Sequence, residues 1–242
     1  RIMPLGDSIT YGVGSTDGAG YRTRLEQRLT AAGLRVDFVG SRDAGPAGAD
    51  DDNEGHSGWT ISRMARGVDR WLGAYRPDVV LLHIGTNDVR LNGYRTGAAK
   101  RLGVLLNRIR RDRPAAHIFV ARIAGSRQPG LQRWIAAYNT GVGRMVAGRD
   151  DPLLHLVDQA GVRAPYLHPN DAGYAAMADT WFTALTTVPA LRAVSAVRAA
   201  SAARVTPPLR DLGVVVGTDH RETPIRATTT PRSRGNQPVV ER

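Results

Sequence analysis

Short apolar runs alternate along the chain with longer segments in which apolar residues recur every three to four positions. A short apolar run bounded by polar residues is typical of a buried strand, and the longer spacing is typical of a helix with one buried face. The runs predict strands at residues 2–5, 36–39, 79–84, 117–121 and 153–157. The periodic segments predict helices at residues 21–32, 61–75, 102–109, 135–145 and 174–185.

Regular alternation of strand and helix indicates an α/β fold. Strands joined through helices lie parallel, and the helices then cover both faces of the sheet. Ligand and catalytic sites in open sheets of this kind lie beyond the carboxyl ends of the strands. The residues that directly follow each predicted strand are therefore the candidates for a functional site.

The strand and helix pattern stops near residue 190, which predicts one domain over residues 1–190. Residues 191–242 form a tail rich in Arg, Ala, Pro and Thr with few large apolar side chains. Such a composition buries too little apolar surface to offset the entropy of ordering, so we expect a poorly ordered tail. One apolar stretch inside it, residues 212–216, has the character of an edge strand.

The chain has 242 residues, a net charge of +11 and no cysteine, and Lys100 is its single lysine. The many arginines are scattered rather than clustered among aromatic residues, which argues against nucleic-acid binding. Disulfides and thiolate metal sites are excluded. No apolar run approaches the roughly 20 residues of a membrane span. Because the chain begins at Arg1, we expect a trimmed start with any export signal upstream.

Three short motifs follow predicted strands: GDSIT at residues 6–10, GTND at residues 85–88 and LHPN at residues 167–170. Each motif alone recurs by chance. In this order and at these positions they bring a serine, an amide side chain and a histidine to one edge of the sheet. Ester hydrolysis needs a nucleophile, a base and donors for the developing oxyanion, so the three motifs together indicate an esterase.

Ser8 and His168 are the candidate nucleophile and general base. Ser8 lies between the first strand and a glycine-rich turn; the alternative is a serine that caps a turn or helix. His168 alone among the six histidines lies between the last strand and the last helix. The others are His56 in a loop, where it could line the site, His83, His117 and His155 in predicted strands, and His220 in the tail.

Asn87 and Gly58 are the candidate oxyanion donors beside Ser8. The Asn87 side chain follows a strand closely and could point at an oxyanion, although an Asx turn would explain it as well. A glycine at position 58 lets its backbone N–H approach a substrate, or it is a plain loop glycine. In each case the combination with the other motifs favours the functional interpretation.

Residues 41–58 are predicted as a long loop that carries three consecutive aspartates, Asp50, Asp51 and Asp52. A calcium site or a substrate rim would explain the charge. No EF-hand-like spacing is present, so we expect a solvated loop and no metal site.

Together with the segment around Gly58, the three motifs resemble the four blocks of the SGNH (GDSL-type) hydrolase superfamily over about residues 1–188. The run NEGHSGWTI at residues 53–61 is similar to secreted bacterial members of carbohydrate esterase family three, the acetylxylan esterase group. The resemblance implies a flavodoxin-like three-layer α/β/α sandwich with a five-stranded parallel sheet, no cofactor and a secreted protein. It also implies an oxyanion hole formed by the N–H groups of Ser8 and Gly58 and the side chain of Asn87.

One position departs from the family. An aspartate usually stands three residues before the histidine and orients the imidazole, whereas this chain has Pro165 there. A main-chain carbonyl near Ala164 or Pro165 could orient the ring, giving a Ser–His dyad, or Asp158 could reach it. The third possibility is a weak or inactive enzyme.

The sequence thus predicts a serine esterase for short acyl esters, with O-acetyl groups on plant polysaccharide such as xylan as the substrate. The partner is an acylated carbohydrate or small ester; no nucleic-acid partner is expected, and no oligomeric state is indicated. A lipase-like or general carboxylesterase of the same family, or a carbohydrate-binding pseudoenzyme, are the alternatives. Trp59 and Trp134 could stack on sugar rings or simply pack in the core or at the rim, and His56 and Trp59 are placed at the substrate rim.

Overall fold

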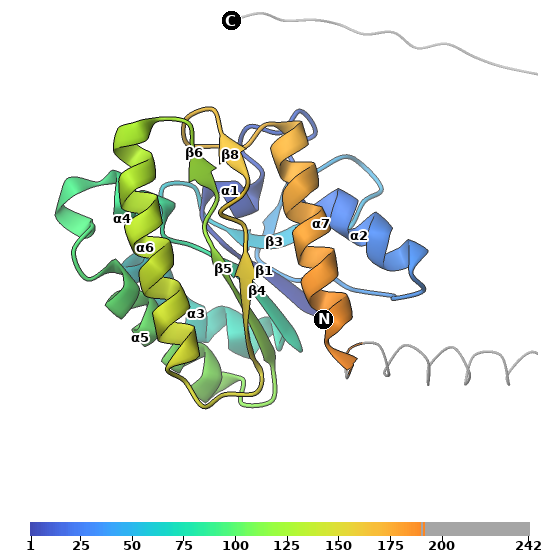
Figure 1. Ribbon diagram of the computed structural model, residues 1–242. Coiled ribbons are helices and arrows are strands. Elements are labelled where there is room, and N and C mark those ends of the chain that lie inside the picture. The colour runs from blue at the N-terminus through green and yellow to red at the C-terminus, as the bar shows by residue number, and fades with distance from the viewer. Residues whose placement is uncertain (190, 192–242) are drawn as a thin grey trace, which may run out of the picture. The chain divides into compact units, whose positions relative to one another are not determined.

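The structure is a computed structural model that describes residues 1–189 and residue 191. Its centre is a six-stranded sheet in the order β2-β3-β1-β4-β5-β7 (Figure 1). All neighbouring strands pair in parallel except β2 and β3, which are antiparallel. The strands are β1 (Ile2–Gly6), β2 (Arg42–Asp43), β3 (Asp52–Gly55), β4 (Val79–His83), β5 (His117–Arg122) and β7 (Leu154–Asp158).

Helices cover both faces of this sheet (Figure 1), which makes the three-layer α/β/α sandwich that the sequence predicts. One face carries α2 (Arg22–Ala31) and α7 (Asp171–Thr187). The other carries α3 (Ile61–Tyr75), α5 (Ala98–Asp112) and α6 (Pro129–Ala147). Short elements lie in the connections: α1 (Ser8–Tyr11), α4 (Thr86–Arg90), the 3₁₀ helix η1 (Asn92–Tyr94) and the small parallel pair β6 (Gly125–Ser126) and β8 (Arg163–Ala164).

Each face of the sheet has its own hydrophobic core. Along β1, Ile2 belongs to the core under α2 and α7, while Met3 and Leu5 belong to the core under α3, α5 and α6. In α3 the spacing of Met64, Val68 and Leu72 brings all three to one buried side of the helix. Burial of each side chain of this size stabilises the fold by about 1.5–3 kcal/mol, so the predicted stripes are what hold the layers together.

The sheet differs from the prediction in the segment between α2 and α3. It has six strands rather than five, because β2 adds an antiparallel strand at one edge. The strand predicted at residues 36–39 is wrong: the segment forms only one isolated bridge, from Phe38 to Ile2. On that side of β1 the parallel neighbour is β3 instead, in the segment that was predicted to be a solvated loop.

Polar side chains explain why β3 was missed. Asn53 and Glu54 are fully buried, and each finds hydrogen-bond partners that replace water. The Asn53 amide donates to the carbonyl of Asp51, and Glu54 accepts from the backbone and hydroxyl of Ser41. Buried polar groups with partners carry little penalty, so this strand needs no apolar run.

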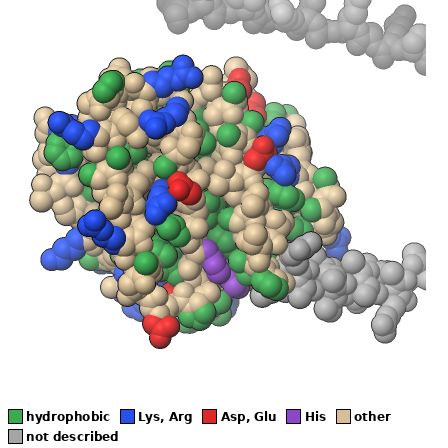
Figure 2. Space-filling model, viewed as in Figure 1, with side chains coloured by type: hydrophobic (Ala, Val, Ile, Leu, Met, Phe, Trp, Pro, Cys, Tyr) green, Lys and Arg blue, Asp and Glu red, His purple; other side chains and the backbone are tan. Residues whose placement is uncertain are grey.

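The surface and the helices bear on the expectations that the chain binds no nucleic acid and has no membrane span. On the face that Figure 2 shows, Lys and Arg side chains are spread singly over the helices rather than gathered in one basic patch. Within the described residues, no helix is long and apolar enough to cross a membrane. Apart from Leu191, the predicted tail lies outside the described residues.

Candidate active site

Ser8 is the first residue of α1, directly beyond the carboxyl end of β1. Asp7 caps this short helix, and its Oδ1 accepts a hydrogen bond from the N–H of Ile9 at 3.0 Å. Ser8 is 5 % exposed, so its hydroxyl lies at the floor of the site rather than on an open turn.

His168 contacts Ser8 although 160 residues separate them. The Ser8 Oγ and the His168 Nε2 lie 2.9 Å apart, which is hydrogen-bond distance. His168 is half-buried. Burial lowers its pKa below the usual 6.5, and the cation of Arg90 lowers it further. A lowered pKa favours the neutral ring, which can accept a proton at Nε2.

The loop that carries His168 is held by the small sheet. β6 pairs with β8, and the Ser126 hydroxyl donates to the carbonyl of Tyr166 at 2.6 Å. After His168, the Asn170 side chain caps α7 by accepting from the N–H of Gly173. Both ends of the loop are thus fixed to regular structure.

The segment after α1 also packs on this loop. Gly14 has φ of +97°, and a Cβ there would lie 3.1 Å from the Cβ of His168 and 2.8 Å from the carbonyl oxygen of Pro169. Only glycine fits that close approach in that backbone conformation. Nearby, Asp171 accepts from the backbone N–H of Thr16 at 2.8 Å. The Ser8 and His168 segments are thereby joined at a second place.

Neither predicted partner orients His168. The Asp158 carboxylate lies 2.9 Å from Arg122 and also accepts from the N–H of Ala160. The carbonyl of Ala164 accepts from the N–H of Arg127 at 2.9 Å. In residues 1–189 no hydrogen bond reaches Nδ1 of His168, so the ring is held through Nε2 and by packing.

The segment around Gly58 is hydrogen-bonded on one side to the strand that precedes Ser8 and on the other to the GTND segment. The N–H of His56 donates to the carbonyl of Gly6 at 2.9 Å. The amide of Asn87, which is 2 % exposed, donates to the carbonyl of Trp59 at 3.0 Å. Because a primary amide has two N–H donors, the second one remains for a substrate. Gly58 itself is exposed with φ of +78°.

His56, which the sequence places at the substrate rim, is 8 % exposed. Its Nε2 lies 2.6 Å from the buried carboxylate of Glu54. Its ring stacks on Trp59 at 4.0 Å and on Trp71 at 4.8 Å between centroids. The residue is therefore a support for the turn that contains Gly58. Trp59 is half-buried, with the Arg63 guanidinium 4.6 Å from its ring centroid, so little of its face is open.

Two buried carboxylates lie under the site. Desolvation raises the pKa of Asp7 from 3.8 to about 7, and the nearby Asp88 adds to the shift. Burial also raises the pKa of Asp88, but Asp88 has strong partners. It accepts from Arg101 at 2.9 Å and from the N–H of Ile61 at 2.9 Å, which fixes the start of α3 beside α4. These groups shape the backbone around Ser8 and Asn87.

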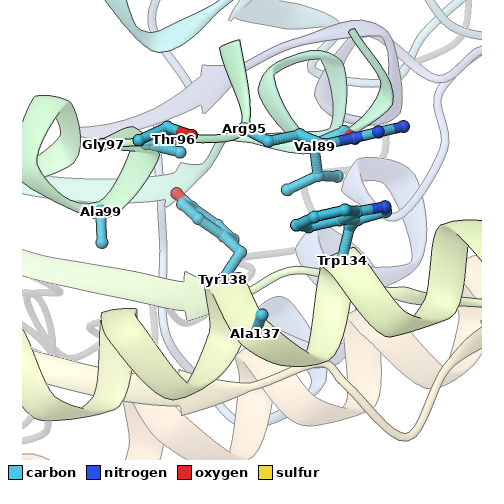
Figure 3. Close-up of a pocket in the computed structure, with 9 residues that line it drawn as sticks. Val89, Arg95, Thr96, Gly97, Ala99, Trp134, Ala137 and Tyr138 are labelled. Atoms are coloured by element: carbon cyan, nitrogen blue, oxygen red, sulfur yellow. The ribbon is translucent and has the colours of Figure 1, made fainter. Parts of the chain in front are cut away.

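A cavity of about 200 Å³ lies between the segment after α4 and helix α6 (Figure 3). The Arg95 guanidinium lies 4.7 Å from the ring centroid of Trp134, and the Tyr138 hydroxyl donates to the carbonyl of Ile84. Arg133 lies 5.2 Å from the same Trp134 ring. Trp134 is thus engaged by arginines and not presented as a free face for a sugar. Within the described residues, no group of three or more His, Asp or Glu side chains could hold a metal ion.

Sequence reasoning missed several residues that build this site. Glu54 gave no signal, because a buried carboxylate in a polar strand reads as part of a loop. Arg101 gave none either, since its pairing with Asp88 spans two helices. Arg90 could have been found, because it lies three residues after Asn87 in a predicted site motif.

Known proteins match most of this chain. The GDSL-like lipase/acylhydrolase family matches residues 5–176. A multidomain esterase from Ruminococcus flavefaciens is 32% identical over 221 residues; the match covers 75% of this chain but only 28% of that protein's length.

Solved structures agree with the sequence match. The Clostridium thermocellum family 3 carbohydrate esterase is 36% identical with a TM-score of 0.69, over 80% of this chain and 98% of that one. A family 3 carbohydrate esterase from Talaromyces cellulolyticus is 28% identical with a TM-score of 0.67, over 79% and 97% of the two chains. The resemblance to this group of SGNH hydrolases is confirmed. The chain belongs to the GDSL-like lipase/acylhydrolase family, a family of carboxylic ester hydrolases.

Proposed function

We propose that the protein is a serine esterase in which Ser8 is the nucleophile and His168 the general base. The observation that carries this proposal is the 2.9 Å contact between the Ser8 Oγ and the His168 Nε2. A hydroxyl at that distance from a neutral imidazole can lose its proton as it attacks a carbonyl.

The reaction has two halves. The Ser8 Oγ attacks the ester carbonyl carbon while its proton passes to Nε2 of His168. The tetrahedral intermediate collapses, the alcohol leaves with the proton from Nε2, and an acyl-serine remains. Water then attacks the acyl carbon, gives a proton to Nε2, and the Ser8 hydroxyl is restored as the acid departs.

The oxyanion is held by the N–H groups of Ser8 and Gly58 and by the free N–H of the Asn87 amide. Two features support this assignment. The turn at Gly58 is exposed. It is held in place by the hydrogen bond from the His56 N–H to Gly6 and by the stacking of His56 on Trp59. The Asn87 amide is oriented by the Trp59 carbonyl. Donors that are fixed before the reaction stabilise the transition state without reorganisation.

The substrate class is short acyl esters, with O-acetyl groups on plant polysaccharide such as xylan as the physiological target. The support is the similarity to family 3 carbohydrate esterases, at 36% identity to the Clostridium thermocellum protein. Action on such a polymer fits a secreted protein. A lipase-like or general carboxylesterase would share the same catalytic residues but prefer lipid or long-chain esters.

Ser8→Ala tests the catalytic assignment, with Ser57→Ala as the matched control because Ser57 is an exposed serine one residue from Gly58. Turnover of a chromogenic acetate ester should vanish in Ser8→Ala and persist in Ser57→Ala. Retained turnover in a clean Ser8→Ala preparation would contradict the proposal, and no turnover in the wild type would favour the carbohydrate-binding pseudoenzyme. Comparison of acetylated xylan with long-chain lipid esters separates the two substrate classes.

A further inference from the structure

Arg90 is an exposed cation beside the proposed base. It is the last residue of α4, three positions after Asn87 in the same helical segment. Side chains three residues apart lie on the same side of a helix, so Arg90 extends from the side of α4 that carries Asn87. Its charge acts on the His168 imidazole, whose pKa it lowers.

The arginines around α4 differ in the contacts that their guanidinium groups make. The Arg95 guanidinium donates to the carbonyl of Val89 at 2.7 Å and stacks on Trp134. The Arg101 guanidinium is paired with the buried carboxylate of Asp88. By contrast, the Arg90 guanidinium makes no hydrogen bond or ion pair within residues 1–189.

The charge around the site is therefore unbalanced. Asp88 is neutralised by Arg101, Glu54 is bonded to His56, and Asp7 is fully buried beneath Ser8. No carboxylate within the described residues forms a hydrogen bond with His168. An exposed guanidinium at the edge of an ester-binding site, without an acceptor from those residues, is a suitable group for binding an anion.

We propose that Arg90 binds a carboxylate carried by the ester substrate, so that esters of acidic sugars, or other esters with a carboxylate near the scissile bond, are preferred. This inference rests on the proposed function. The planar guanidinium can donate two parallel hydrogen bonds to a carboxylate, which a neutral substrate cannot accept in the same way. The same charge also raises the local concentration of acidic substrates before binding.

The test compares two aryl acetates that differ in one group. 4-Acetoxybenzoate carries a carboxylate on the leaving alcohol, and 4-acetoxybenzamide carries a neutral amide of nearly the same shape. The ratio of their kcat/KM values is measured in the wild type, in Arg90→Gln and in Arg90→Lys. Because both substrates meet the same base in each variant, any effect of the substitution on His168 cancels from the ratio.

The ratio should fall about tenfold in Arg90→Gln, the scale of one partly exposed charge-assisted interaction, and less in Arg90→Lys. Arg70→Gln, which removes an exposed arginine from α3, is the control for a general loss of charge. An unchanged ratio in Arg90→Gln, or an equal fall in Arg70→Gln, overturns the inference. A wild type that hydrolyses neither ester contradicts the proposed function instead.

A second pair of substrates locates the carboxylate. Mono(4-nitrophenyl) succinate places it on the acyl part, and its kcat/KM is compared with that of 4-nitrophenyl acetate in the same variants. A fall confined to the benzoate pair puts the bound carboxylate on the alcohol side, and a fall confined to the succinate pair puts it on the acyl side. Removal of the Arg90 cation should also raise the pKa of His168 and move the acid limb of kcat/KM for the neutral ester to higher pH.

Discussion

The two sides of the site are built very differently. The proposed oxyanion side, which comprises Ser8, Gly58 and Asn87, is supported by buried polar groups and by hydrogen bonds from three separate segments. The base side is His168 and its loop. In the described residues the His168 ring has a single hydrogen bond, the one to Ser8.

The difference shows which side of the site is held more firmly by buried groups and hydrogen bonds. Buried carboxylates such as Glu54 and Asp7 are costly unless they are bonded, and they cluster on the oxyanion side. Fixed donors are worth a large part of an esterase's rate. A carboxylate behind the histidine adds to the rate but is not needed to remove the serine proton. We therefore infer an enzyme that relies on its oxyanion hole and works with a Ser–His dyad.

The largest expected effect comes from breaking the support beneath Gly58. His56→Phe keeps a ring between Trp59 and Trp71 but leaves the buried Glu54 carboxylate without its imidazole partner. Removal of one partner of such a pair costs about 3–5 kcal/mol, so the free energy of unfolding should fall by that amount. Denaturant titration measures it.

The double variant His56→Phe with Glu54→Gln is the control for that prediction. It removes the charge as well as the imidazole, so part of the lost stability should return. If His56→Phe alone unfolds like the wild type, the pair does not support the turn.

Asn87→Ala should come next, with a loss of about 10²–10³ in kcat, the scale for one oxyanion donor. KM should change little, because the bond strengthens in the transition state rather than in the ground state. Steady-state kinetics on an acetate ester measures both parameters. A large change in KM with unchanged kcat would show that Asn87 binds substrate without stabilising the oxyanion.

Asp7→Asn tests how the buried Asp7 carboxyl changes the free energy of unfolding with pH. A carboxyl whose pKa is raised from 3.8 to about 7 binds its proton more tightly in the folded state, so wild-type stability falls as pH rises through that interval. Asn keeps the oxygen that caps Ile9 but does not titrate. Between pH 5 and pH 8 the wild type should lose about 2–3 kcal/mol more unfolding free energy than the variant. If denaturant titrations show that the wild type and the variant lose the same unfolding free energy between pH 5 and pH 8, the prediction is contradicted.

Much of the fold could be predicted because its helices and most of its strands follow apolar patterns. The failure at residues 36–39 has a physical cause. The N–H of Phe38 donates to the Asp50 side chain at 2.6 Å rather than to a strand, and Gly40 packs against the backbone of Asn53. Only Phe38 and Val39 of this run are buried, beside Ile2 at the start of β1, and the polar β3 pairs with β1 further along, at Leu5 and Gly6.

The candidate site also has parts that the sequence predicts and parts that it does not. The contact between Ser8 and His168 could be predicted because both residues follow predicted strands, and strand ends meet at one edge of the sheet. The pairing of Asp158 with Arg122 could not, because both residues belong to adjacent strands whose register is known only from the structure. The contacts of His56 with Glu54 and Trp71 could not be predicted for a similar reason, because they depend on β3 entering the sheet.

The most direct test of the dyad is Pro165→Asp, which puts a carboxylate three residues before His168 on an exposed loop position. Measurement of kcat on a chromogenic acetate ester, beside Asp158→Asn, decides the question. The dyad predicts a rise in kcat of about tenfold, since a carboxylate stabilises the imidazolium by a kcal/mol or more, and little change in Asp158→Asn. A fall of about 10⁴ in kcat in Asp158→Asn, the scale of losing a triad acid, would contradict the dyad.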